Sequence, residues 1–193
     1  MTGNIDFILK RRSIRRFEPR PVEAEKITLL LQAGMSAPTA VNSQPWEFVV
    51  VTEDPLLKQL RAALEYGKME APLILAVLGS PKVASNFAGE TYWVQDCSAA
   101  VENILIAAAN LELGAVWVGV YPRPKKMEAV RQVLSIPKDV MPLCLLHIGY
   151  PAEGKPPHTK YKEERIHWQQ YKSDKPYLMK PFYKLVDKMI KLV

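Results

Sequence analysis

Four arginines and one serine crowd into a short stretch near the N-terminus. Residues 11–21 read RRSIRRFEPRP, so that Ser13 stands between two arginine pairs. Guanidinium groups and a hydroxyl that converge in this way suit a phosphate, whose oxygens accept several charge-assisted hydrogen bonds. A solvated basic face, a nucleic-acid contact and a targeting tag are alternatives that the segment alone leaves open.

The remaining residues provide no catalytic or metal-binding pattern. None of the three histidines (His147, His158, His167) is paired with another at the i+3 or i+4 spacing of a metal site. Neither Cys97 nor Cys144 has a histidine beside it, and the chain has no GxSxG or GxGxxG motif. We therefore predict no catalytic side chain and no metal, and we expect a cofactor to carry the chemistry of any reaction.

One phosphate-binding motif is nearly matched. Residues 149–155 read GYPAEGK and have the spacing of a P-loop, but Pro156 stands where Ser or Thr would hold magnesium. Pro151 also removes a backbone donor from a loop that would need its donors. We interpret this segment as a turn that follows a strand.

The composition is that of a folded protein with an excess of positive charge. The 193 residues are 48% hydrophobic and carry a formal net charge of +6, which favours anionic partners. The N-terminus does not resemble a signal peptide, and no run of about 18 apolar residues predicts a membrane span. Both cysteines lie in apolar stretches and are expected to be buried free thiols. These features predict a cytoplasmic protein that does not enter a membrane.

Helices and short strands alternate along the chain, which predicts an α+β or α/β fold with a small central sheet. The helix between residues 91 and 113 is apolar around most of its circumference and should be buried. Gly34 is expected to end the helix before it. We expect strands at 47–52, 73–79, 115–120 and 141–150, and helices at 4–10, 21–33, 54–65, 91–113, 124–134, 163–171 and 177–192.

The last residues are predicted to form an arm. Residues 1–170 would make up the main body, with 171–193 as a helical arm of the same domain. Its apolar face needs a surface to cover it, which either a second subunit or the chain's own body could provide. The residues of that face are Leu178, Phe182, Leu185 and Met189.

Four segments in order resemble the nitroreductase family of FMN-dependent oxidoreductases. They are RRSIRRF at 11–17, SAPTAVNSQPW at 36–46, LGAVWVG at 113–119 and GYP at 149–151, within a resemblance that extends over residues 5–167. The resemblance implies an α+β homodimer with FMN at the subunit interface. It also implies a small mixed central sheet, flanked by helices around the long buried helix.

The resemblance also assigns roles to particular residues. The basic segment would hold the flavin phosphate, ribityl chain and ring edge through Arg11, Arg12, Ser13 and Arg15. The partner subunit would cover the flavin with Pro38, Thr39, Ala40, Asn42 and Gln44. Backbone groups near the flavin N5 and O4 would come from Trp117, Val118, Gly119 and Val120. Further contacts to the phosphate would come from His158 and Lys160. The side chain at the pyrimidine edge of the ring is left open, within residues 64–69.

The implied reaction is a ping-pong cycle. NADH or NADPH would reduce the flavin at N5 and leave, and a small electron-poor acceptor such as a nitroaromatic or a quinone would then take the electrons. Other activities of the same family, dehydrogenation or dehalogenation, and a non-catalytic flavin-binding protein are the alternatives. A nucleic-acid-binding module is expected to lack a chromophore and to bind in a salt-dependent way, and we do not predict one.

Overall fold

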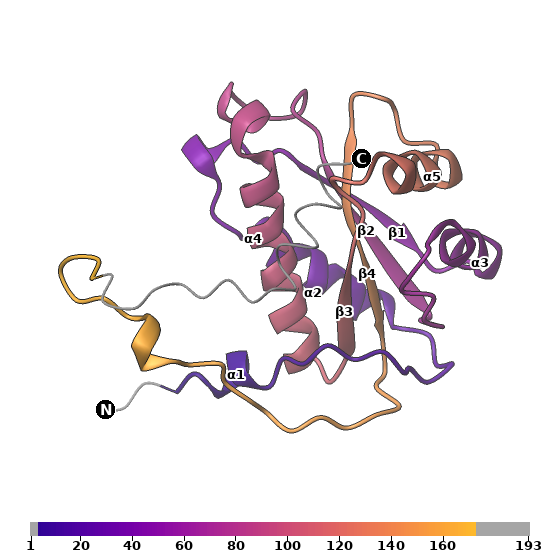
Figure 1. The fold of residues 1–193 in the computed structure, drawn as a ribbon. Helices are drawn as coiled ribbons and strands as arrows, with labels where there is room; N and C mark the ends of the chain where they lie inside the picture. The colour runs from indigo at the N-terminus through magenta and orange to yellow at the C-terminus, as the bar shows by residue number, and fades with distance from the viewer. Residues whose placement is uncertain (1–3, 173–193) are drawn as a thin grey trace. The chain divides into compact units, whose positions relative to one another are not determined.

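The chain divides into two compact units, residues 1–158 and 159–193, and the computed structural model describes residues 4–172. The first unit contains a four-stranded sheet with helices on both faces (Figure 1). This unit also has two short elements. They are α1 (Asp6–Leu9), which precedes the other helices, and the 3-10 turn η1 (Ala40–Asn42), which precedes the first strand. No helix among the described residues is long and apolar enough to cross a bilayer.

The sheet is antiparallel in every strand pair. Its strands lie in the order β1-β2-β4-β3 and are β1 (Trp46–Val51), β2 (Leu73–Gly79), β3 (Gly114–Gly119) and β4 (Met141–Gly149). The expected α+β nitroreductase-like fold is confirmed, but the expectation of a mixed sheet was wrong. Strands that are apolar along their whole length are typical of parallel sheets. Here the same pattern arises because helices cover both faces of an antiparallel sheet.

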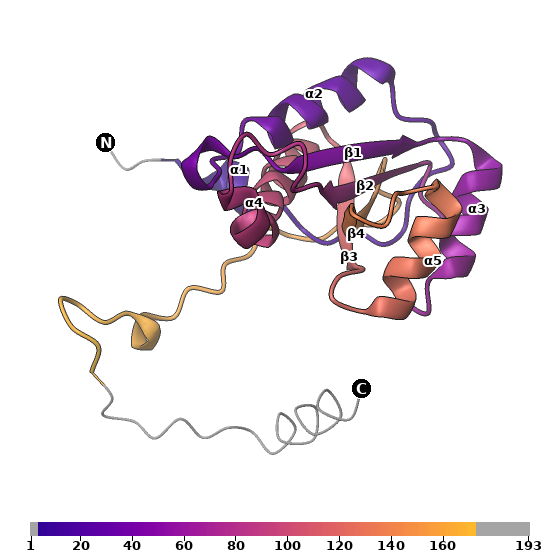
Figure 2. The ribbon, with the colours of Figure 1, turned by 90° about the horizontal axis from the view of Figure 1, so that it is seen from above.

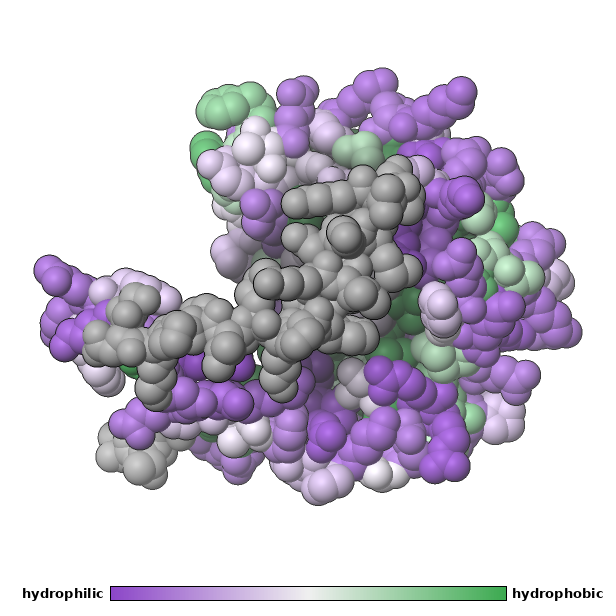
Figure 3. Space-filling view, in the orientation of Figure 1, coloured by the Kyte–Doolittle hydropathy of each residue, from purple (hydrophilic) through white to green (hydrophobic). Residues whose placement is uncertain are grey.

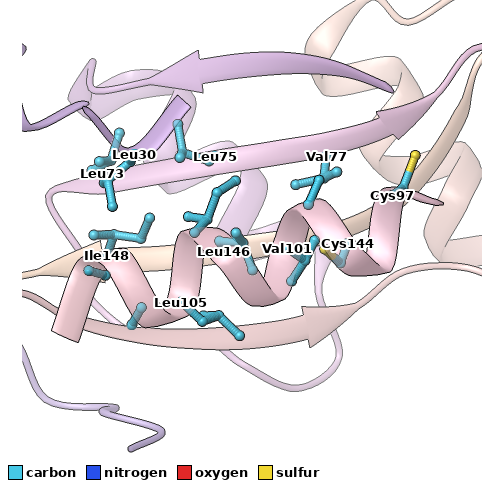
Figure 4. Packing of buried hydrophobic residues seen from close by; sticks show 14 of the residues in the cluster. Leu30, Leu73, Leu75, Val77, Cys97, Val101, Leu105, Cys144, Leu146 and Ile148 are labelled. Atoms are coloured by element: carbon cyan, nitrogen blue, oxygen red, sulfur yellow. The ribbon is translucent and has the colours of Figure 1, made fainter. Parts of the chain in front are cut away.

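One face of the sheet packs against the long helix α4 (Ala88–Asn110), as predicted from its apolar circumference. Alternate residues of β2 and β4 point to this face and meet Cys97, Val101 and Leu105 of the helix (Figure 4). Each such side chain contributes roughly 1.5–3 kcal/mol when fully buried. The strand residues are Leu73, Leu75, Val77, Cys144, Leu146 and Ile148. Cys97 and Cys144 are buried free thiols, as expected.

Helix α2 (Ala24–Met35) packs against α4, and it includes the glycine that was expected to end it. Gly34 is buried inside the helix, and a Cβ at this position would lie 2.8 Å from Cδ1 of Ile104. The glycine therefore allows the two helices to approach closely. From the sequence alone, this role could not be distinguished from that of a glycine that ends a helix.

Helices α3 (Asp54–Ala63) and α5 (Pro124–Leu134) lie side by side on the other face of the sheet (Figure 2). They enclose a second core, to which the remaining alternate strand residues contribute. The core residues from the strands are Val51, Ile74, Ala76, Leu78 and Leu145, and those from the helices include Leu57, Leu60 and Val130. Two layers of helix thus fix the sheet on both sides, which leaves its edge strand β3 for other contacts.

In the second unit, residues 159–172 contain one 3-10 turn, η2 (Glu163–Arg165), where a helix over 163–171 was expected. The predicted helix at 177–192 and its apolar face lie outside the described residues. Most of the face of the molecule seen in Figure 3 is hydrophilic where described atoms are visible, with apolar side chains in small patches. This surface agrees with the charged composition of the chain.

Candidate functional site

The arginine segment lies along the free edge of β3. Ser13 forms a parallel bridge with Ala115, and the Ile14 N–H donates to the Ala115 carbonyl at 3.1 Å. Ile14 is buried against Gly114, where a Cβ would lie 2.7 Å from the Ile14 Cβ. The glycine and the apolar side chain therefore fix the backbone of a segment that is otherwise strongly polar.

The turn after β4 holds the same segment from its other side. The Glu18 N–H donates to the Tyr150 carbonyl, and the Ala152 N–H donates to the Arg16 carbonyl, both at 2.9 Å. Phe17 bridges to Pro151 within this pair of bonds. The GYP segment, one of the four that carry the family resemblance, therefore acts here by positioning the arginines.

Glu153 lies at the centre of this contact. Its Oε1 accepts the Arg15 N–H at 2.6 Å and the Lys155 ammonium at 2.9 Å, and Lys155 also donates to the Ser13 carbonyl at 2.6 Å. The backbone N–H of Arg15, followed by Lys155, lowers the pKa of Glu153 to about 2, so the carboxylate stays ionised. Neither residue was predicted as part of the site. The signal available was an acidic and a basic residue placed just after GYP, opposite a cluster of arginines.

The arginine side chains diverge from this common backbone. The Arg11 Nε lies 2.9 Å from Oε1 of Glu102 on α4, and Arg12 donates to the carbonyl of Pro156. Arg12 lines a cavity of about 380 Å³, together with Lys10, Glu153 and Lys155. Arg15 is exposed and lines a different cavity of about 460 Å³. The predicted cluster thus has one member already paired with a carboxylate and two that face separate cavities.

The larger cavity lies along β3. Three of the four predicted strand residues, Trp117, Val118 and Gly119, line it. A Cβ on Gly119 would meet no atom within 4 Å, so the backbone at this position opens onto free space. Val120 is fully buried in the second core and its N–H donates to the Leu143 carbonyl at 3.0 Å, so in this structure it contributes to packing.

The segment left open for the pyrimidine edge also reaches this cavity. Tyr66, Gly67 and Met69 are among its lining residues. Gly67 has a positive φ of 82°, and a Cβ there would lie 2.9 Å from the Val118 side chain. The glycine therefore lets the segment approach β3 closely enough to close one side of the cavity.

The loop at residues 38–44, which is predicted to reach a partner subunit, is held in place by hydrogen bonds to helix α4. Asp96 of α4 is buried, and it accepts the Ala40 N–H at 3.0 Å and the Ser43 hydroxyl at 2.8 Å. Asn42 and Gln44 both have positive φ, 53° and 49°, and their side chains are joined by a 2.8 Å hydrogen bond. Strained backbone of this kind persists only where the surroundings hold it.

None of the predicted loop residues lines either cavity of its own chain. Pro38, Asn42 and Gln44 are exposed, and Thr39 and Ala40 are half-buried. His158 is exposed at the end of the first unit, and Lys160 belongs to the second unit. The structure therefore joins the arginine segment to β3, while the parts assigned to the loop and to these two basic residues stay predictions.

The fold defines an α+β protein whose basic segment, paired with an edge strand, brings cationic side chains to two cavities. The Nitroreductase family model matches residues 8–67 and 59–150, which is more than half of the chain. The chain belongs to the nitroreductase family, and the expectation that it is an enzyme of this family is confirmed.

Individual relatives agree with this assignment. A protein of Archaeoglobus fulgidus named "Putative NADH dehydrogenase/NAD(P)H nitroreductase" is 40% identical over 172 residues, which cover 86% of this chain and 98% of the relative. A crystal structure of the same name from Bacteroides thetaiotaomicron is 45% identical with a TM-score of 0.82, covering 88% of this chain and all of the other. A nitroreductase structure "in complex with fmn" from Desulfovibrio desulfuricans is 29% identical with a TM-score of 0.72, covering 89% and 100% of the two chains.

Proposed function

We propose that this protein is an FMN-dependent oxidoreductase that passes electrons from NADH or NADPH to a small electron-poor acceptor, such as a nitroaromatic or a quinone. The observation that carries the proposal is the cavity beside β3, which is lined both by the open backbone at Gly119 and by Arg15 of the arginine segment. The FMN complex of the Desulfovibrio relative and the names of the other two relatives support the choice of cofactor and donor.

The residues present fit a flavin. A planar ring needs a surface without a side chain in its way, and Gly119 leaves such a surface open. Since β3 is an edge strand, some of its backbone groups face away from β4, and those beyond Ala115, whose carbonyl binds the Ile14 N–H, could meet a ring edge. For the phosphate, Arg12, Ser13 and Lys155 bring cationic and polar groups together beside the smaller cavity.

When bound, FMN would supply a two-electron centre that accepts and donates hydride at N5. The chain's own part is to bind, orient and enclose it. The backbone of Trp117–Gly119 would fix the ring, the arginine segment would hold the phosphate, and Glu153 would keep that segment in register. A cation near the ring, such as Arg15, would favour the negative charge that a flavin gains on reduction.

The buried titratable groups are poor candidates for acid, base or nucleophile. Burial raises the pKa of Cys97 to about 12 and that of Cys144 well above its ordinary value, so both remain thiols. Burial also lowers the pKa of His147, which is enclosed in the sheet. We therefore propose no catalytic side chain, and protons would come from water or the substrate.

The proposed active form is a homodimer with the flavin between subunits. The loop at residues 38–44 is held in a fixed conformation by Asp96, yet it lines neither cavity of its own chain. An ordered loop that lines neither of these two cavities is suited to cover the flavin of a second copy.

A direct test is to measure the FMN content of the purified protein and its oxidation of NADH and NADPH with menadione as acceptor. We expect stoichiometric FMN and acceptor-dependent turnover with at least one of the two donors. A protein that binds no added FMN, or that holds FMN but oxidises neither donor, would contradict the proposal. Parallel lines in double-reciprocal plots would support the ping-pong order.

A further inference from the structure

The cavity beside β3 carries a strong excess of positive charge. Three of its lining residues, Arg15, Arg123 and Lys126, are cations, and among the described residues that line it none is Asp or Glu. Three aromatic side chains share the same lining, from Tyr66, Trp117 and Tyr121. A pocket with aromatic walls and cations without carboxylates is suited to a planar ligand that carries negative charge.

Lys126 is the least expected of these cations because it is 92% buried, with 8% of its surface exposed. No described residue forms an ion pair or a hydrogen bond with its ammonium group. The contact found is the ring of Tyr66, whose centroid lies 5.7 Å from Nζ. Most of the side chain is buried, so the ammonium has little freedom to turn away from the cavity, and a cation–π contact at this distance is a weak one. The lysine lines the cavity, so a ligand there could supply the missing partner.

Lys126 lies in the first turn of α5, a second feature that favours an anion here. The N-terminus of a helix carries partial positive charge and favours acidic residues, yet the first turn of α5 contains none. Arg123 stands at the N-cap, and its Nη1 lies 3.9 Å from Oε2 of Glu65. Both of those side chains are mostly exposed, so this pair offsets little of the charge. The end of the cavity at α5 therefore favours an anionic group.

We propose that the cavity recognises its small-molecule ligand by an oxyanion, a carboxylate or a phosphate, which pairs with Lys126 and Arg123. The planar part of the ligand then lies among the aromatic side chains, beside the flavin ring that β3 would hold. Arg15 comes from the segment beside the start of β3, whereas Arg123 and Lys126 come from the chain after its end. The inference rests on the proposed function only in assuming that the ligand is an electron acceptor or a pyridine nucleotide.

The test compares two ligands that differ in charge alone. Oxidised, FMN-loaded protein is titrated with 4-nitrobenzoate and with its neutral analogue 4-nitrobenzamide, and binding is followed by the visible spectrum of the flavin. We expect the wild type to bind the carboxylate at least about tenfold more tightly than the amide. Lys126→Met should abolish this preference, and Lys126→Arg should keep most of it.

Lys125→Met is the matched control. It removes the same charge one residue away, from an exposed side chain that does not line the cavity. Its preference for the carboxylate should match that of the wild type. A preference lost equally in both lysine variants would reflect net charge alone and would overturn the proposal.

Steady-state kinetics separate the two sources of the oxyanion. If Lys126→Met raises the KM for NADH and NADPH about tenfold and Lys125→Met does not, the oxyanion is a phosphate of the donor. If the carboxylate preference is lost instead, the acceptor supplies it. If Lys126→Met changes neither the KM for the donors nor the carboxylate preference, the proposal is overturned. This holds even if the variant lowers the reduction potential of the flavin, because the lysine would then act on the reduced flavin and not on a ligand.

Failure of the proposed function would look different. A wild-type protein that binds no FMN contradicts the proposed function and leaves this inference to be judged by calorimetry with the same two ligands. A preference for 4-nitrobenzoate that depends on Lys126 would still support the anion site, and equal affinity for both ligands would overturn it.

Discussion

At the scale of single residues, Glu153 links the backbone of the arginine segment to the rest of the chain. Its carboxylate binds the Arg15 N–H and the Lys155 ammonium, and Lys155 in turn binds the Ser13 carbonyl. Because Arg15 donates with its backbone, the guanidinium group stays available for a ligand. The sequence identified the arginines by their number and spacing, but it did not reveal which acidic residue orients them.

We predict that Glu153→Gln lowers affinity for FMN by roughly tenfold, since the bond from Lys155 loses its charge. Fluorescence titration of FMN into flavin-free protein measures this, with Glu25→Gln, an exposed residue elsewhere, as the control. The pKa of Glu153 is lowered to about 2 in the folded protein. In the wild type, the contribution of Glu153 to the unfolding free energy should therefore be complete above pH 4.5 and be lost as the pH falls towards 2. Unchanged FMN affinity in Glu153→Gln would mean that the arginines need no such anchor.

His147 should make the fold sensitive to acid. It is fully buried in β4 and neither ring nitrogen has a hydrogen-bond partner among the described residues. Burial, with a smaller contribution from Arg61, lowers its pKa from 6.5 to about 4. The neutral form is therefore favoured in the folded state, and stability should decline as the pH falls from 6.5 to 4.

We predict a loss of up to roughly 3 kcal/mol in unfolding free energy across this range, beyond the effect of other groups. His147→Leu should remove that part of the pH dependence and raise stability at pH 5, since an apolar residue suits an apolar site. Urea denaturation at pH 7 and pH 5 measures both effects. The same pH dependence in the variant and the wild type would assign acid sensitivity to other residues.

At the scale of elements, α4 joins the core to the loop predicted to reach a partner. Its apolar positions contact the sheet, while Asp96 on the same helix binds Ala40 and Ser43. The sequence predicted α4 as a long buried helix because its apolar residues surround it. In the sequence, Asp96 is only a polar residue that interrupts the apolar pattern of the helix. Its role as an anchor depends on the hydrogen bond from Ser43, which lies 53 positions earlier in the chain.

We predict that Asp96→Asn and Ser43→Ala each lower unfolding free energy by about 1–3 kcal/mol, because a buried polar partner is left unsatisfied. The double variant should cost less than the sum of the two, since both remove one interaction. Chemical denaturation of the four proteins completes the cycle, and Asp139→Asn, on the exposed Lys82 pair, is the control. Additive losses would show that the loop is not held through this bond.

The direction of the strands was the part of the fold that the sequence could not specify. Short apolar runs predicted four strands near their observed positions, and the turn residues around them were recognisable. Whether neighbouring strands run parallel depends on which strands become neighbours, and β2 pairs with β4 although two helices and β3 lie between them in the chain. Burial on both faces then gives the same apolar pattern for either direction.

At the scale of the whole molecule, the proposed site is split between two parts that one chain does not bring together. The arginine segment and β3 line the cavities, and the loop at residues 38–44 does not. The resemblance to a family of homodimers gave the loop its role. No pattern of residues within one chain could reveal it, because the contact would lie between copies.

We predict that Arg15→Ala and Asn42→Ala each weaken FMN binding as pure homodimers, and that mixed dimers recover part of it. A mixed dimer contains one intact site, with the arginine from one chain and the asparagine from the other. After subunit exchange at equal concentrations, flavin content should reach about a quarter of the wild-type value. No recovery, or a site complete in a monomer, would contradict the shared site.

The proposed function requires that this chain binds a flavin that pyridine nucleotides reduce. The visible absorption spectrum of the purified protein, recorded without oxygen before and after adding NADH or NADPH, tests it most directly. We predict a flavin spectrum that bleaches with at least one donor and returns when a quinone is added. A colourless protein that does not take up added FMN, or a bound flavin that neither donor bleaches, would contradict the proposed function.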